Sequence, residues 1–172
     1  ARVTGRSEQG MDIFSGTVLA SGGTVIRGAK SGIRLVLDTS ADEPATLTLD
    51  NSTVIGETGA ALQVNGLVGD PDATINVTNG SQLQGANDVL LEVILGGTAE
   101  LNVSGSVLDG HVIIESGSTG TVNLLNGSVL TGRLENVETL SVSSAAQWVM
   151  VEDSTLQNLE MGSGGAVSYT HL

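Results

Sequence analysis

The sequence contains no cysteine, only two prolines and one residue each of Phe, Tyr and Trp among its 172 residues. Without cysteine, no disulfide can hold the fold together, and nothing can cross-link an unfolded chain during export. The scarcity of aromatic residues excludes a globule organised around large aromatic side chains. The hydrophobic 40% of the chain therefore consists mainly of Val, Leu, Ile and Ala, and it suffices for the core of one domain.

Basic residues are also scarce. Six Lys and Arg stand against 19 Asp and Glu, which gives a formal net charge of −13. Five of the six basic residues lie in the first 34 positions, and Arg133 is the only one that follows them. A chain with this charge is repelled by nucleic acid and by anionic lipid, so neither is expected as a partner.

The sequence shows no long hydrophobic run. No apolar stretch approaches the roughly 20 residues that a membrane span needs, so no membrane insertion of this segment is expected. The most hydrophobic window, residues 89–95, is interrupted by Glu92 and predicts a buried strand. Residues 1–10 are polar, so no secretory signal peptide is visible there.

A motif recurs along the chain: an alternating apolar segment, a corner rich in Asn, Gly and Ser, a short apolar segment and a closing glycine. The closing glycines occur at intervals of 28, 29, 25 and 22 residues, at Gly28, Gly56, Gly85, Gly110 and Gly132. The apolar positions of the alternating segments recur at steps of 29, 28, 26, 21 and 18 residues, from Val18 through Leu47, Ile75, Leu101 and Val122 to Leu140. Repeats of roughly 20 to 30 residues are typical of solenoids, in which each unit stacks on its neighbours.

The period within each repeat decides between helix and strand. Pairs of apolar residues two positions apart alternate with Thr, Asn, Glu and Ser, as in Leu47/Leu49, Ile75/Val77, Leu101/Val103, Val122/Leu124 and Leu140/Val142. This alternation, with 24 glycines and abundant β-branched residues, predicts strands. A third apolar segment follows each closing glycine, in residues 32–38, 60–68, 89–95, 111–114 and, more weakly, 133–138. Three strands per repeat predict an all-β, triangular parallel β-helix.

The corner residues and the variable segments have different expected roles. Asn79-Gly80, Asn126-Gly127 and, less well, Ser104-Gly105 stand where the chain turns between two faces, and Asn and Gly tolerate positive φ. Leu124 and Leu130, on either side of one such corner, are expected to point into the same interior. The longer early repeats carry extra residues in 39–46 and 66–74, which predict surface loops. Because insertions in a solenoid cluster on one edge, that edge is the expected recognition surface.

Near the C-terminus the sequence becomes more specific than its repeat. Residues 134–169 resemble the end of the passenger domain of pertactin-like autotransporters, and 121–167 carry the resemblance most strongly. Its residues here are Leu140, Val142, Ala146, Trp148, Val149, Met150, Ser154, Leu156, Leu159, Met161, Gly164, Gly165 and Val167. The upstream segments LTLDNSTVIG and INVTNGSQLQG also look like that family.

The resemblance implies a right-handed, single-stranded parallel β-helix of the pectin-lyase-like type, with about six to seven coils of three strands. It implies a non-enzymatic passenger on the surface of a Gram-negative bacterium, whose loops adhere to protein or glycan on host or neighbouring cells. Residues 1–167 would be a fragment of the passenger domain. Its expected partner within the full-length chain would be a C-terminal outer-membrane β-barrel. Coils 121–167 would nucleate folding during secretion, with Trp148 as a hydrophobic plug, and residues 168–172 resemble a non-native tail. No Arg-Gly-Asp tripeptide is present, so integrin-type adhesion has no residue support.

The alternative is a carbohydrate-active β-helix, either a polysaccharide hydrolase or lyase or a phage tail-spike protein. A lyase needs a basic residue beside acidic ones, and Arg133 is the only base after position 34. A glycosidase needs two carboxyl groups about 5 to 9 Å apart. Asp70 and Asp72 are the nearest candidates, and they could also bind calcium weakly, but two solvated loop aspartates are expected.

No other residue set predicts a catalytic, cofactor-binding or metal site. His111 stands alone at the start of its segment and is expected to face solvent. The N-x-S/T triplets at Asn51, Asn76, Asn79, Asn102 and Asn126 are explained by corners and strand faces and need no glycan. No catalytic residue, metal or cofactor is therefore expected.

Overall fold

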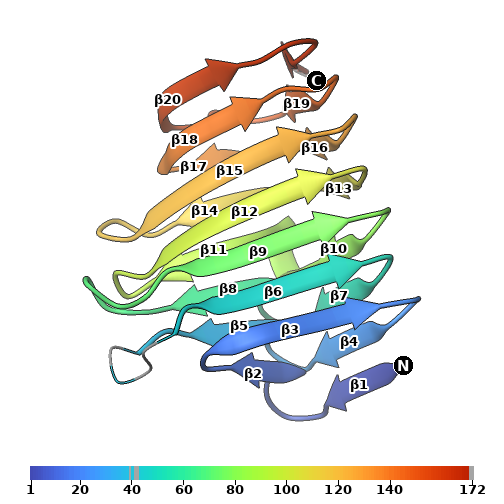
Figure 1. Cartoon of the computed structure of the whole chain (residues 1–172), viewed down its shortest axis with the longest axis vertical. Helices are drawn as coiled ribbons and strands as arrows, with labels where there is room; N and C mark the ends of the chain where they lie inside the picture. Colours follow the sequence, from blue (N-terminus) through green and yellow to red (C-terminus); the bar gives the residue numbers. More distant parts are fainter. Residues whose placement is uncertain (39, 41–42, 171–172) are drawn as a thin grey trace.

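The computed structural model describes residues 1–38, 40 and 43–170 and places them in an all-β fold of parallel sheets. Successive strands belong to different faces, and over most of the chain each strand pairs with the third strand after it (Figure 1). The sheets are therefore stacked from repeats that follow one another along the chain. This arrangement is consistent with a β-solenoid.

Four sheets make up the stack, and η1 (Ala86–Asp88) is the 3₁₀-helix among the described residues. Sheet I contains β1 (Arg2–Gly5), β4 (Val25–Gly28), β7 (Thr53–Gly56) and β10 (Gln82–Gln84). Sheet II contains β2 (Met11–Ile13), β5 (Ile33–Val36), β8 (Leu62–Asn65), β11 (Val89–Ile94), β14 (His111–Ile114) and β17 (Leu134–Glu135). Sheet III contains β3 (Gly16–Ser21), β6 (Ala45–Asp50), β9 (Ala73–Thr78), β12 (Thr98–Ser104), β15 (Thr119–Leu125), β18 (Val137–Val142) and β20 (Leu156–Met161). Sheet IV contains β13 (Val107–Asp109), β16 (Val129–Thr131), β19 (Gln147–Met150) and β21 (Ala166–Tyr169).

The register of sheet III is the one that the repeat predicts. Partners across its strands include Val18 with Leu47, Leu47 with Ile75, Ile75 with Leu101, Leu101 with Val122 and Val122 with Leu140. The steps of 29, 28, 26, 21 and 18 residues therefore separate residues that are neighbours in space. Strands of a parallel sheet lie about 4.8 Å apart, so each apolar residue stacks on the one before it.

The stacked apolar residues form the core. All ten residues of the five alternating pairs are buried, and Leu124 and Leu130 are both fully buried. Glu92, which interrupts the window 89–95, points outward from β11 between buried neighbours. Leu95 corrects the prediction for that window, because it lies beyond β11 and is 58% exposed.

Trp148 lies in the last fully enclosed repeat. Its side chain is 3% exposed, and its indole Nε1 donates a hydrogen bond of 3.0 Å to the carbonyl oxygen of Gly132. In register, Trp148 stands between Leu130 of β16 and Val167 of β21. A large side chain with a satisfied N–H is thus buried beneath β21, as expected of a buried aromatic residue.

The segments that join sheet III to sheets I and IV are short, and we call them the tight corners. They are residues 22–24, 51–52, 79–81, 105–106, 126–128, 143–146 and 162–165. Positive φ occurs at Asn79, Gly80, Asn126, Gly127 and Gly105, which confirms the predicted turning positions. The corner at 143–146 uses Ser144 and Ala145 at positive φ instead.

Each of four tight corners buries a serine, which the sequence interpretation did not single out. Ser52, Ser81, Ser106 and Ser128 are 0–3% exposed. Ser128 Oγ lies 2.6 Å from the Leu125 carbonyl oxygen and 3.0 Å from that of Val103, so its one O–H is shared between them, and it accepts from the Ser106 N–H at 3.5 Å. The Ser81 hydroxyl accepts from the Ser52 N–H in the same way, at 3.0 Å. The recurrent serine therefore satisfies buried backbone groups between neighbouring repeats.

The closing glycines are needed because backbone approaches them closely. A Cβ on Gly132 would lie 1.7 Å from the Gly110 carbonyl oxygen, and one on Gly28 would lie 1.9 Å from that of Ser31. No side chain fits at such distances. The recurrence of these glycines is therefore a packing requirement.

The asparagines of the N-x-S/T triplets lie where expected. Asn51, Asn79 and Asn126 occupy tight corners, whereas Asn76 and Asn102 lie on the outer face of sheet III. The outer asparagines form an amide ladder: Asn123 Nδ2 donates to Asn102 Oδ1 at 2.8 Å, and Asn102 Nδ2 donates to Asn76 Oδ1 at 3.1 Å. Their recurrence follows from stacking.

Candidate functional site

The segments that join sheet II to sheet III differ in length from repeat to repeat, and we call this side of the stack the loop edge. It comprises residues 14–15, 37–44, 66–72, 95–97, 115–118 and 136. The predicted loops 39–46 and 66–74 lie here, although residues 39 and 41–42 fall outside the described part and residues 45–46 and 73–74 already belong to strands. Repeats also shorten at a second place, between β13 and β14, where Gly110 alone joins the strands.

Carboxylates hold the loops of this edge in place. Asp70 Oδ2 accepts a hydrogen bond of 2.6 Å from the Leu67 N–H, and Glu115 Oε2 accepts one of 2.7 Å from the Leu95 N–H. Ser118 Oγ accepts from the Gly96 N–H at 3.0 Å. Charge-assisted bonds to backbone N–H groups are stronger than neutral ones, so these acids fix the positions of two exposed leucines.

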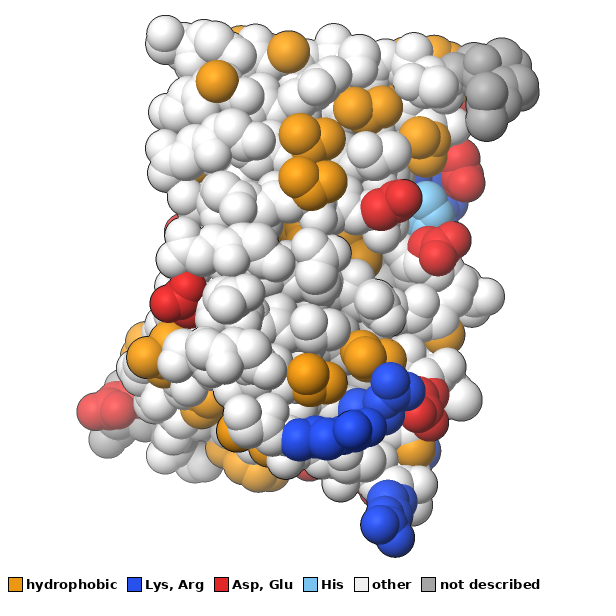
Figure 2. Space-filling model, turned by 90° about the vertical axis from the view of Figure 1, so that its right-hand side faces the viewer, with side chains coloured by type: hydrophobic (Ala, Val, Ile, Leu, Met, Phe, Trp, Pro, Cys, Tyr) orange, Lys and Arg blue, Asp and Glu red, His pale blue; other side chains and the backbone are white. Residues whose placement is uncertain are grey.

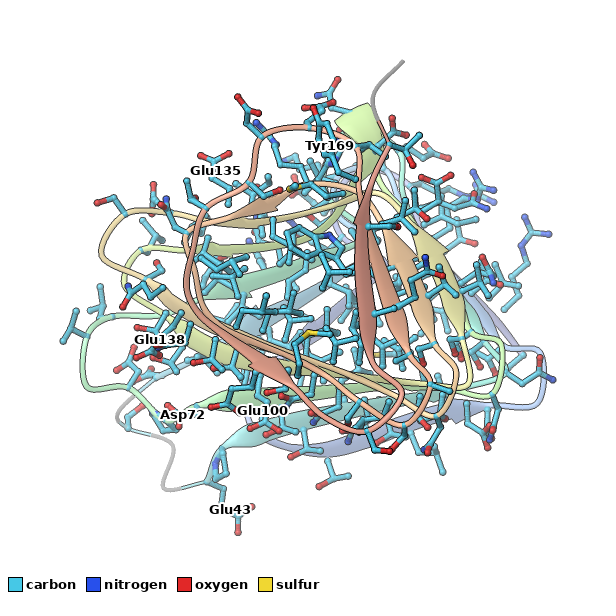
Figure 3. The ribbon with its side chains drawn as sticks, turned by 90° about the horizontal axis from the view of Figure 1, so that it is seen from above. Glu43, Asp72, Glu100, Glu135, Glu138 and Tyr169 are labelled. Atoms are coloured by element: carbon cyan, nitrogen blue, oxygen red, sulfur yellow. The ribbon has the colours of Figure 1, made fainter. Side chains whose placement is uncertain are left out.

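The loop edge is acidic. Figure 3 shows Glu43, Asp72, Glu100 and Glu138 on the same side of the molecule, at or near the N-terminal ends of sheet III strands. Asp38, at the start of loop 37–44, accepts a hydrogen bond from the Ser40 N–H, and this bond lowers the pKa of Asp38 below its ordinary value. No Lys or Arg occurs anywhere between residues 35 and 132.

Asp70 and Asp72 do not behave as a matched pair. Asp70 is partly buried and bonded to the Leu67 N–H, whereas Asp72 is exposed at the start of β9. The Asp70 carboxylate closes a turn. Among the described residues, no hydrogen bond joins Asp70 to Asp72. Their positions favour a structural role in the loop for Asp70.

His111 lies on the outward face of β14, opposite the buried Val112, as expected, but its neighbours cover much of its side chain. Its side chain is 15% exposed, its Nδ1 accepts from the Arg133 N–H at 2.9 Å, and its Nε2 lies 3.9 Å from Glu152 Oε1. Arg133 NH1 lies 3.4 Å from Glu135 Oε2 in the same cluster. Figure 2 shows the histidine among acidic side chains, well separated from most of the Lys and Arg side chains at the N-terminal end. The bond to Nδ1 leaves the Nε2 atom to carry the proton of the neutral ring.

No group of three or more His, Cys, Asp or Glu side chains among the described residues could hold a metal ion. In the same part of the chain, no helix has the length and apolar character needed to cross a membrane.

The sequence interpretation missed the exposed apolar residues of the loop edge. Leu67, Val68 and Leu95 are 68%, 85% and 58% exposed. Their signal was present in the sequence: Leu67 and Val68 stand inside a loop rich in Gly, Asp and Pro, and Leu95 stands directly before Gly96. Such residues break the two-residue alternation and have no partner position in the core.

The chain was compared with protein families, with curated proteins and with solved structures, and nothing matches it in any of the three comparisons.

Proposed function

We propose that this chain is a right-handed, single-stranded parallel β-helix of the pectin-lyase-like type, with about six to seven coils of three strands. In this proposal it is the passenger part of a pertactin-like autotransporter, displayed outside a Gram-negative bacterium. It acts as a rigid stalk without catalytic activity, and its loops contact protein or glycan on host or neighbouring cells.

One observation carries this proposal. The residues that recur between repeats are those that the fold uses internally: apolar residues of the core, corner serines and closing glycines. The loop edge carries the longest segments, 37–44 and 66–72, and the exposed side chains of Leu67, Val68 and Leu95. A scaffold with one variable edge suits recognition by loops on a rigid support.

The C-terminal repeats support the proposed role in secretion. Leu140, Val142 and Ala146, which carry the family resemblance, are fully buried around Trp148. By contrast, β20 and β21 cover this repeat with largely exposed strands, and Leu159 and Met161 are 47% and 48% exposed. A large buried aromatic side chain beneath the end of the stack is suited to nucleate the first coils, from which the others propagate.

The gene tests the proposal most directly. We expect the reading frame downstream of residue 167 to encode alternating strands of about ten residues ending in an aromatic residue, as in an outer-membrane barrel. A frame that encodes a soluble catalytic domain instead would contradict the passenger assignment.

A second experiment separates the stalk from a carbohydrate-active β-helix. The purified chain is incubated with a panel of polysaccharides, and new reducing ends are measured. We expect no new reducing ends from any polysaccharide, whether or not the chain binds it. Reproducible cleavage of any polysaccharide would overturn the non-enzymatic role.

A further inference from the structure

A groove opens at the loop edge, between the first and second long loops. Its volume is about 190 Å³, and it is lined by Val36, Leu37, Asn65, Gly66, Leu67 and Leu95. A cavity of about 150 Å³ with an apolar lining accommodates a benzene-sized group. The groove is therefore large enough to accept one apolar side chain of a partner.

The rim of the groove carries exposed apolar side chains on two adjoining loops. Leu67 and Leu95 line the groove, and Val68 beside them is 85% exposed. The loops touch, because a Cβ on Gly96 would lie 3.0 Å from the Val68 backbone N. Single exposed aliphatic residues are ordinary, but three on adjoining loops at the mouth of a groove form an apolar patch of the kind that binds partners.

Leu95 is held at this position at a conformational cost. Its φ is +63°, a left-handed conformation that bulky residues rarely adopt, and its N–H is bonded to Glu115. Asparagine occupies most of the other non-glycine positions with positive φ. Leucine at a position that favours Asn is consistent with a requirement for its apolar side chain on the surface.

The charge around the groove indicates which partner fits. Asp70 and Glu115 bond the backbone of the two lining leucines, and Asp38, Glu43 and Asp72 lie along the same edge. No Lys or Arg lies between residues 35 and 132, and Arg34, two residues before Val36, is already paired with Asp12. We propose that the groove docks a cationic segment of a partner protein, with one apolar side chain in the groove and flanking Lys or Arg beside the carboxylates. This inference rests on the proposed function, because it names the partner class of the same loop edge.

The test uses the full chain and two labelled peptides of equal length, one alternating Lys and Leu and the other alternating Glu and Leu. Fluorescence anisotropy measures their binding to the wild type, to the double variant Leu67→Ser/Leu95→Asn and to Val107→Thr. Val107 is 60% exposed on β13, away from the loop edge, and provides the matched control. Asn is chosen at position 95 because it tolerates the positive φ.

We expect the Lys-Leu peptide to bind the wild type and Val107→Thr alike, and to bind the double variant at least about tenfold more weakly. Added salt should weaken binding, and the Glu-Leu peptide should not bind. Equal binding of the Lys-Leu peptide to all three proteins, or equal binding of the two peptides, would overturn the proposal, as would no binding at all. If the double variant is not folded by circular dichroism, Leu67→Ser alone provides the comparison.

A parallel measurement separates this inference from the proposed function. The full chain is displayed on cells through an outer-membrane barrel, and adhesion to other cells is measured for the wild type and the double variant. Adhesion that persists in the double variant, without Lys-Leu binding by the purified chain, overturns the groove and leaves the passenger role intact. Groove-dependent peptide binding by the purified chain, without adhesion of the displaying cells, supports the groove and contradicts the proposed adhesive role.

Discussion

The two edges of sheet III are built on opposite principles. The tight corners repeat the same residues, bury a serine in four of the repeats and vary little in length. The loop edge varies from residues 37–44 in one repeat to residue 136 alone in another, and it exposes leucine and valine. Recurrence in this chain therefore marks contacts between repeats, whereas irregularity marks surface that stacking does not constrain.

The largest expected effect comes from the core that the tight corners enclose. We expect Trp148→Ala to lower the free energy of unfolding by about 3–5 kcal/mol, because it leaves a large cavity and removes the indole that bonds the Gly132 carbonyl oxygen. The matched change at the loop edge, Leu67→Ala, should stay within about 0.5 kcal/mol. Equilibrium denaturation by urea measures both. Similar values for the two variants would remove the contrast between core and edge.

A smaller loss is expected from a corner serine. Ser128→Ala leaves the buried Ser106 N–H without its acceptor and should cost about 1–3 kcal/mol. Ser116, exposed in the loop-edge turn 115–118, provides the control, and Ser116→Ala should change stability little. The urea concentrations at the unfolding midpoints, compared at a common m-value, give the change in unfolding free energy for each variant. A corner serine as tolerant as Ser116 would mean that its recurrence has another cause.

Asn and Leu can be exchanged between positive-φ positions of the two edges. The two exchanges should change the free energy of unfolding in different directions. Asn126→Leu places a bulky residue at φ +51° and should destabilise the fold by about 1–2 kcal/mol. Leu95→Asn removes a leucine from φ +63° and should leave stability unchanged or raise it by up to about 1 kcal/mol. Thermal unfolding of the two variants, scanned side by side, measures the sign. A loss of stability in Leu95→Asn would show that Leu95 packs more than its exposure indicates.

The smallest effect is expected from lengthening the loop edge. A Gly-Ser pair inserted after Gly69 should cost less than about 0.6 kcal/mol, the penalty for doubling a flexible loop. The same pair inserted after Gly127 should cost far more, because it displaces Ser128 from the carbonyl oxygens of Leu125 and Val103. Comparable unfolding free energies for the two insertions would contradict the distinction between the edges.

Much of the fold could be predicted from the sequence because stacking imposes a two-residue alternation and a recurrent register. Leu101 and Val122 could be matched before their strands were seen, since like residues lie on like. The loop-edge groove could not be predicted, because it depends on how loops of unequal length meet. Leu95, for example, reads as the end of a buried strand until its φ of +63° turns it outward.

The packing of His111 was also beyond the sequence. Its contacts come from Arg133 and Glu152, which are brought beside it only when the repeats stack. Because these residues do not belong to the repeated motif, no periodic signal relates them.

The register of the stack is the central claim, and a disulfide tests it most directly in this cysteine-free chain. Thr121 and Thr139 are partners on neighbouring strands of sheet III, about 4.8 Å apart, within the range that a disulfide spans. We expect Thr121→Cys/Thr139→Cys to oxidise completely to an intramolecular disulfide, whereas Thr121→Cys/Ser141→Cys, shifted by two residues, should not. Equal oxidation of the two pairs, or preference for the shifted pair, would contradict this register.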